Sequence, residues 1–178
     1  IYCVTSSGCR PIGTPFVVTK AQGGQILELS GMPALSAAQS MAEALPESER
    51  AAFSQGLLVG IAMNAAKPRL GRGDFVVRTV AGLDPERGVI ALSDPVAVGS
   101  TIQFQLRDAD TAHQDLDMLL DAEMLRERPA AALLFSCQLR GSRLYGLGEH
   151  DAALVSRRLG GVPMAGFHCA GEVAPIGR

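Results

Sequence analysis

A run of short apolar segments between residues 74 and 106 constrains the fold of this chain more than any other feature. The segments "DFVVRTV", "VIALSD" and "TIQFQL" have the length of strands and are rich in β-branched residues, and the turn sequences "DPERG" and "VGS" separate them. In "TIQFQL" apolar and polar residues alternate, which is typical of a strand with one buried and one wet face. We therefore predict a β-meander of three strands, with Gln103 and Gln105 facing water.

The preceding residues predict a hairpin and at least one helix. Residues 15–29, "PFVVTKAQGGQILEL", indicate two strands joined at a pair of glycines. Residues 32–45 have apolar side chains at helical spacing, with a proline near each end. Residues 47–64 fit either a second helix or a helix followed by a strand, because two glycines weaken the helical pattern.

The last third of the chain alternates between helix and strand patterns. Residues 108–128 carry an apolar stripe and predict a helix, and a shorter helix is expected at 151–159. The unbroken apolar run at 130–137 is typical of a central strand covered on both faces, and another strand is expected at 162–169. We predict an α+β fold with a mixed, largely antiparallel sheet that contains a meander and is packed by three to four helices.

Composition limits the class of protein. The chain has 178 residues, 47% of them hydrophobic and 19% charged, which suits one folded domain or a compact pair that shares one core and excludes a disordered chain. The formal net charge is -2 and no block of Lys or Arg stands out, so we expect neither nucleic acid nor an anionic membrane as a partner. The longest apolar stretch, at residues 56–63, is too short to span a bilayer.

The cysteines suggest a reducing compartment, and the first residue suggests a longer parent protein. The four cysteines lie at positions 3, 9, 137 and 169 and form no CxxC pair, which favours reduced thiols and a cytoplasmic location over a disulfide framework. The chain begins with Ile1 in place of methionine. We therefore expect a single domain, residues 1–178, excised from a longer protein.

His168 and Cys169 stand next to each other near the end of the chain and could form a catalytic pair. Neighbouring residues on a strand point to opposite faces, so the two side chains cannot form a hydrogen-bonded dyad while the strand is regular. A buried thiol behaves as a small apolar side chain. His168 could also bind a metal or haem, although no partner motif such as HExxH accompanies it.

Polar residues in turns and at strand ends are the remaining candidates for a binding site. In "GCRPIG", Cys9 and Arg10 lie in a turn that could aim a guanidinium at a carboxylate or phosphate, or leave it solvated. Gln138, Arg140 and Glu172 follow apolar strands, where proteins with sheets often present ligand contacts. Another turn contains the tripeptide Arg-Gly-Asp at 72–74. We reject an adhesion role for it and interpret Asp74 as a turn or strand-start residue.

Taken together, "GCRPIG", "GRGDFVVR", "LLFSCQLRG" and "GGVPMAGFHCAGEVAPIG" resemble the FIST C-terminal domain over nearly the whole chain. This resemblance implies a small-ligand-binding sensory domain of intracellular signal transduction in bacteria, preceded by a FIST N-terminal domain and coupled to a signalling output domain. Pattern positions and strand-end residues together give the candidate ligand-binding set: Cys9, Arg10, Arg72, Asp74, Cys137, Gln138, Arg140, Cys169 and Glu172.

The resemblance implies an amino acid or related metabolite as the ligand, with no cofactor and no enzymatic activity. One alternative is a haem-based nitric oxide sensor that uses His168 or a cysteine, although similar domains more often have an aromatic residue at this position. A cysteine-dependent hydrolase is a further alternative. The chain stops at Arg178, where similar domains continue into another strand, and an unpaired sheet edge would allow a homo-oligomer or the docking of the N-terminal domain.

Overall fold

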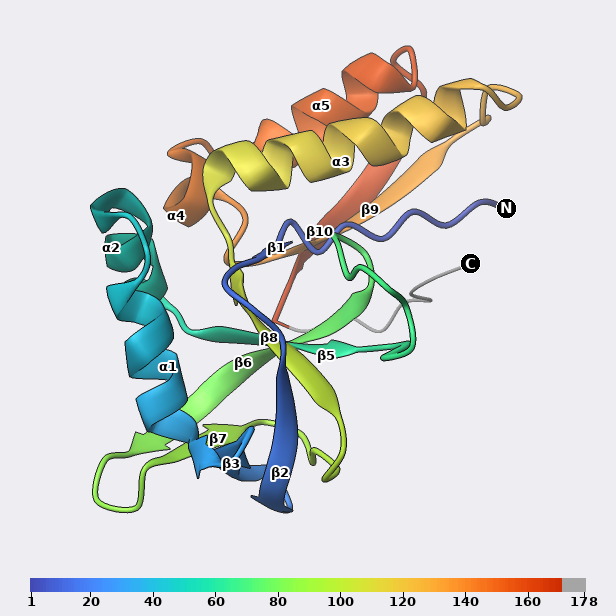
Figure 1. Cartoon of the computed structure of the whole chain (residues 1–178). Helices are drawn as coiled ribbons and strands as arrows, with labels where there is room; N and C mark the ends of the chain where they lie inside the picture. Colours follow the sequence, from blue (N-terminus) through green and yellow to red (C-terminus); the bar gives the residue numbers. More distant parts are fainter. Residues whose placement is uncertain (171–178) are drawn as a thin grey trace. The chain divides into compact units, whose positions relative to one another are not determined.

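The computed structural model describes residues 1–170, without the side chains of residues 54 and 55, and divides into two compact units. Residues Cys9–Arg107 form the first, called here the barrel unit. Residues Ile1–Gly8 and the chain from Asp108 onward form the second, called here the α/β unit (Figure 1). Residues 1–170 contain no helix with the length and apolar character that a bilayer-spanning segment needs.

The barrel unit is a closed ring of six antiparallel strands. Around the ring each strand pairs with the next, and β8 pairs with both β2 and β5 to close it. Closure matters because every ring strand then has neighbours on both sides, which removes exposed sheet edges. The ring order is β2 (Phe16–Gln22), β3 (Gln25–Leu29), β7 (Val89–Leu92), β6 (Phe75–Asp84), β5 (Leu58–Ala62) and β8 (Thr101–Leu106).

Two short strands and two helices complete this unit. Strand β1 (Arg10–Pro11) pairs with β8, and β4 (Met32–Pro33) pairs with β3. Helix α1 (Ala34–Glu43) confirms the helix expected at 32–45. Residues 47–64 form helix α2 (Glu47–Gln55) followed by strand β5, which is the second of the two expected arrangements. The hairpin predicted at 15–29 is confirmed as β2 and β3.

The fold contains a meander, but the predicted order of its strands was partly wrong. Strands β5, β6 and β7 pair in sequence, whereas β8 does not follow β7 in the sheet. The reason lies in residues 93–100, which are too long for a tight turn. They run along the β2–β3 hairpin, where the N–H of Val96 donates to the carbonyl of Gly23 and that of Gly99 to Val18, at 3.0 and 2.8 Å.

The core of the barrel unit is aliphatic, with Phe104 fully buried at its centre. The ring of Phe104 packs edge to face against Phe16 and Phe53, with centroids 5.8 and 5.9 Å away. The prediction that Gln103 and Gln105 face water was wrong, because both are buried. Residues 12 and 13 run beside β8, so the Nε2 of Gln103 donates to the carbonyl of Gly13 at 2.8 Å.

The α/β unit places two parallel strands beside three helices. Strand β9 (Ala132–Cys137) pairs in register with β10 (Met164–Cys169), and the helices are α3 (Ala109–Met124), α4 (Ser142–Tyr145) and α5 (His150–Arg158). The side chain of Asp108 caps α3 by accepting from the N–H of Thr111 at 2.7 Å. The expected helices at 108–128 and 151–159 are confirmed, while α4 falls in a region where no helix was predicted.

Within the described part of the α/β unit, only one face of the β9–β10 sheet is covered. Alternate residues such as Leu134 and Met164 pack against a small core of Leu116, Leu120, Leu154 and Val155. On the other face, called here the open face, Leu133, Phe135 and Phe167 are 73%, 51% and 65% exposed. The prediction of a central strand was therefore wrong, because β9 pairs only with β10 among the described residues and one face of their sheet is uncovered within the α/β unit. An apolar run does not distinguish one covered face from two.

Candidate functional site

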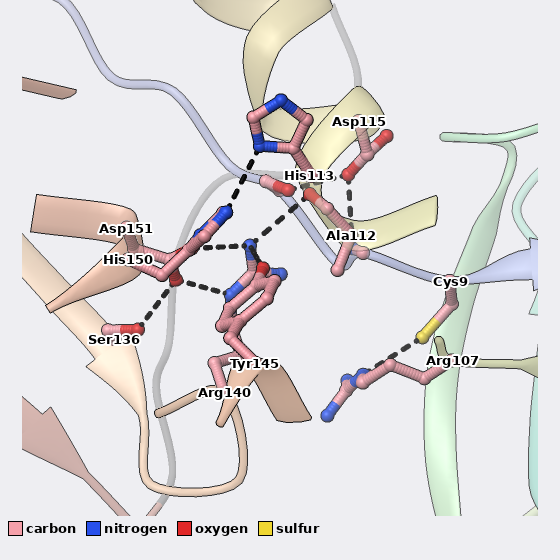
Figure 2. A network of polar contacts seen from close by, with 12 residues as sticks. Cys9, Arg107, Ala112, His113, Asp115, Ser136, Arg140, Tyr145, His150 and Asp151 are labelled. Atoms are coloured by element: carbon pink, nitrogen blue, oxygen red, sulfur yellow. Dashed lines mark hydrogen bonds and ion pairs between the residues drawn. The ribbon is translucent and has the colours of Figure 1, made fainter. Parts of the chain in front are cut away.

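A buried ion pair between Arg140 and Asp151 lies at the centre of a network of polar contacts in the α/β unit (Figure 2). Arg140 follows β9 and Asp151 lies in the first turn of α5, where the helix dipole favours an acidic residue. The Nε of Arg140 donates to Oδ2 of Asp151 at 2.6 Å, and Nη2 donates to Oδ1 at 3.2 Å. Both residues are less than one-tenth exposed. This bidentate geometry is the stronger form of a guanidinium–carboxylate ion pair.

Neighbouring groups keep Asp151 ionised in spite of its burial. Its carboxylate also accepts from Oγ of Ser136 at 3.1 Å and lies 3.3 Å from Nδ1 of His150. Burial raises the pKa of Asp151, but the hydrogen bonds and charge of Arg140, helped by His150 and Ser136, lower that pKa further than burial raises it. The pKa of Arg140 is likewise lowered by burial but raised on balance by Asp151. The two charges stabilise each other.

The remaining donors of Arg140 show how tightly this guanidinium is enclosed. Nη2 also donates to the hydroxyl of Tyr145 at 3.0 Å, whereas the buried Nη1 has no hydrogen-bond partner among the described residues. Nη1 lies against Gly8, which has a φ of +64°, and a Cβ at this position would clash with it. Glycine is therefore required here both for its backbone conformation and for the close approach of Arg140.

A second buried carboxylate, Asp115 on α3, holds the N-terminal segment in place. Its Oδ2 accepts from Oγ of Ser6 at 2.6 Å and from the backbone N–H of Gly8 at 3.0 Å. Two donors satisfy the carboxylate, which is 8% exposed. Residues 6–8 are thereby fixed beside α3, where Gly8 faces Arg140.

Two histidines extend the network beyond the ion pair. Nδ1 of His113 and Nε2 of His150 are 3.1 Å apart, so one ring donates and the other accepts. The ring of Tyr145 stacks on that of His150 with centroids 3.7 Å apart and an angle of 14°. A continuous hydrogen-bonded path therefore runs from Asp151 through His150 to His113.

Two pockets adjoin this network. The first has a volume of about 320 Å³, and its polar lining comes from Ser136, Arg140, Asp151 and His168. Ser136 and His168 belong to the helix-covered face of the β9–β10 sheet, together with the apolar lining residues Leu134 and Met164. The second, of about 590 Å³, includes His113, His150, Glu149 and Arg157 in its lining. The first combines apolar walls with a few convergent polar groups, as small-molecule sites do.

The predicted site residues fall into both units. Cys9 accepts from Nε of Arg107 at 3.4 Å, and Arg10 pairs with Glu49 at 2.8 Å, both in the barrel unit. In the same unit, the hydrogen bonds of Lys67 and of the Gly71 N–H lower the pKa of Asp74. Asp74 lies in the turn just before β6, as predicted, and Arg72 is exposed beside it.

In the α/β unit the structure brings several predicted residues together. Arg140 lines the first pocket, and Cys137 lies opposite Cys169 in the sheet register. Gln138 is exposed, with its backbone N–H donating to the carbonyl of Cys169 at 2.9 Å. His168 lies on the face opposite Cys169, which confirms that the adjacent pair forms no dyad. Glu172 lies outside the described residues, and ligand binding by the whole set stays a prediction.

Sequence reasoning missed most of the polar network, whose further members are Ser136, Tyr145, His113, His150, Asp151 and Asp115. An acidic residue at the start of α5 is adequately explained by the helix dipole, so its sequence position carries no signal for a buried partner. Within residues 1–170, no group of three or more His, Cys, Asp or Glu is arranged to hold a metal ion.

The chain is thus an α+β protein in which one unit is a closed barrel and the other contains the two pockets. The family model of the FIST C domain matches residues 37–175, and that of the FIST N domain matches residues 1–32. The chain belongs to the FIST C domain family. FIST domains are proposed sensory domains in signal transduction and are not known as enzymes.

The curated relatives are mycobacterial. The uncharacterized protein Mb0898c of Mycobacterium bovis is 46% identical over 97% of this chain, which spans 45% of that relative. The uncharacterized protein Rv0628c of Mycobacterium tuberculosis is 42% identical over 97% of this chain, which spans 46% of its length. The chain therefore covers about half the length of the relatives it matches. No solved structure matches it at a significant level.

Proposed function

We propose that the α/β unit binds a small zwitterionic metabolite, such as an amino acid, and that this binding is the input of a sensory domain. The observation that carries the proposal is the first pocket, which sets the Arg140–Asp151 pair into a partly apolar wall. Its volume of about 320 Å³ lies near the lower end of the range of about 300–1,000 Å³ that ligand pockets occupy. A small metabolite suits that size.

Charge balance supports a zwitterion over a simple ion. Arg140 and Asp151 already neutralise each other, so a ligand with one unpaired charge would bring an uncompensated charge into a poorly solvated site. A molecule with an ammonium and a carboxylate group adds no net charge and can interact with both ends of the Arg140–Asp151 dipole. Ser136 and His168 then supply the neutral polar contacts.

The same proposal includes a cellular setting. The domain works in the bacterial cytoplasm, beside a FIST N-terminal domain, and passes the signal to an output domain of a longer protein. It uses no cofactor and catalyses no reaction. The greater length of the mycobacterial relatives and the sensory role proposed for the family support this setting.

Ligand screening by thermal shift and calorimetry tests the proposal. We expect at least one amino acid to stabilise the protein, by about 2.7 kcal/mol at a concentration 100 times its Kd, while analogues with only the amine or only the carboxylate bind more weakly. If no zwitterion stabilises the protein, or if single-charge analogues bind equally well, the proposal is wrong.

A pocket-filling variant makes the test specific. Gly148 lines both pockets, and a Cβ added to it would meet no atom within 4 Å, so Gly148→Val takes up space at their shared lining without a steric clash. Gly82 in β6 has the same free space and provides the matched control Gly82→Val. We expect only Gly148→Val to abolish binding, and equal binding by both variants would place the ligand elsewhere.

Haem binding at His168 stays a separate prediction. Reconstitution with haem would give a Soret band that is lost in His168→Ala. A Soret band combined with no response to amino acids would favour the haem sensor over the proposal made here.

A further inference from the structure

Cys137 and Cys169 face each other at the ends of the two strands of the α/β unit. They are the last residues of β9 and β10 and are direct partners in the parallel register. Both lie on the open face, which they share with Phe135 and Phe167. Both thiols are free and half-buried, so a small oxidant can reach them.

The spacing of paired strands suits a disulfide between these two residues. Neighbouring strands lie about 4.8 Å apart, which falls within the range of about 4.4–6.8 Å that disulfides require between Cα atoms. Side chains that leave two paired strands in the same direction keep their Cβ atoms about as far apart as the strands, about 4.8 Å, which exceeds the separation of about 3.8 Å that is usual in a disulfide. The bond would therefore draw the strand ends together. Such mild strain makes a disulfide easier to reduce.

We propose that Cys137 and Cys169 form a reversible intramolecular disulfide, which makes the end of this sheet a redox-sensitive modification site. The inference does not depend on the proposed ligand. It rests on the register of β9 and β10 and on the accessibility of both thiols.

A peroxide supplies the oxidising equivalents. One thiolate attacks a peroxide oxygen, the O–O bond breaks, and the products are a sulfenic acid and, with the proton released by the thiol, one water or alcohol molecule. The thiolate of the second cysteine then attacks the sulfenic sulfur, the S–O bond breaks, and the departing hydroxide takes up the second proton to give water. Two thiols are oxidised and one peroxide is reduced. A dithiol reductant reverses the bond by thiol–disulfide exchange.

The position of the pair links the bond to the first pocket. Ser136 and His168, one residue before each cysteine, line that pocket from the opposite face of the sheet. The backbone N–H of Arg140 donates to the carbonyl of Cys137 at 2.8 Å, so the turn that positions the guanidinium starts at this cysteine. Drawing Cys137 toward Cys169 would move both the turn and the pocket wall.

The other two cysteines serve as internal controls. Cys3 is exposed in the N-terminal segment, which precedes the first strand and belongs to no sheet. Cys9 is 2% exposed and accepts a hydrogen bond from Arg107. Exposure alone would favour oxidation of Cys3, whereas the pairing of strands favours Cys137 with Cys169.

The experiment treats the reduced chain with one equivalent of hydrogen peroxide and follows the intact mass and peptide map under non-reducing conditions. We expect the loss of two hydrogens, a linked peptide that joins residues 137 and 169, and recovery of the thiols with dithiothreitol. The Cys3→Ser variant should behave like the wild type, and both should remain folded by circular dichroism.

The variants Cys137→Ser and Cys169→Ser should each lose the internal bond and accumulate a sulfenic acid that dimedone traps on the remaining cysteine. A bond that involves Cys3 or Cys9, a bond between two molecules, or oxidation of both cysteines to sulfinic acid without a linked peptide would each overturn the proposal.

Discussion

The barrel unit and the α/β unit bury their polar groups in different ways. In the barrel unit the ring of strands satisfies the backbone by closure, and the centre is filled with aliphatic side chains around Phe104. The α/β unit has a two-stranded sheet, a smaller apolar core, and the buried pair of Arg140 and Asp151 beside it. A two-stranded sheet is marginal by itself. The α/β unit therefore depends on specific polar contacts, and it also contains the pockets described above.

Substitution of Phe104 is the strongest test of the barrel side of this comparison. Phe104→Ala should lower the free energy of unfolding by about 3–5 kcal/mol, because it leaves a cavity and removes two edge-to-face ring contacts. Phe135→Ala on the open face should cost about 1 kcal/mol or less, since that ring is already half-exposed. Urea unfolding followed by far-UV circular dichroism measures both, and similar losses would contradict the difference between the two units.

The ion pair is the corresponding test of the α/β unit. Asp151→Ala should cost about 3–5 kcal/mol, because it leaves the guanidinium of Arg140 buried without a counter-charge. The double variant Arg140→Met/Asp151→Ala should be more stable than Asp151→Ala, since no unpaired guanidinium remains. A double-mutant cycle in urea that also includes the single variant Arg140→Met gives the coupling between the two residues. Additive losses would mean that the pair contributes no specific stability.

Gly8 tests the close approach of the N-terminal segment to Arg140. Gly8→Ala should cost about 1–3 kcal/mol, because the new Cβ both strains a backbone with φ +64° and clashes with the guanidinium and with Ala112. Gly23→Ala is the matched control, since Gly23 has φ +59° but open space around it. The difference between the two variants in thermal stability isolates the effect of the clash. Equal losses of stability would show that the side chain of Arg140 moves aside at little energetic cost.

Local sequence patterns predicted which segments form helices and strands better than they predicted which side chains of those segments are buried. The alternation in "TIQFQL" correctly indicated a strand, but burial of Gln103 depends on residues 12 and 13, which are about 90 positions away in the sequence. The apolar run at 130–137 correctly indicated β9, although the exposure of Phe135 depends on what lies over the sheet. The sequence did not identify Asp151 as a buried charge, because an acidic residue in the first turn of a helix is common at exposed helix starts as well.

Acid sensitivity is the smallest expected effect and separates the two units again. The pKa of Asp151 is lowered by Arg140 against the effect of burial, and the pKa of Asp74 is lowered first by the hydrogen bond from Lys67. A carboxylate with a lowered pKa in the folded state stabilises the fold above its unfolded pKa of about 3.9, and this contribution disappears as the pH falls through the folded pKa. We therefore expect the urea midpoint to fall progressively as the pH drops below about 4.

The variant Asp74→Asn should flatten this acid slope only slightly, because its ion pair with Lys67 is partly exposed and screened by solvent. Asp151 should account for more of the slope, since its charge is buried beside Arg140. Fits of the urea midpoint against pH for the wild type and for Asp74→Asn measure the share of each carboxylate. A slope that vanishes in Asp74→Asn would place the acid-sensitive charge in the barrel unit, and the α/β unit would then not depend on its ion pair in the way that its geometry indicates.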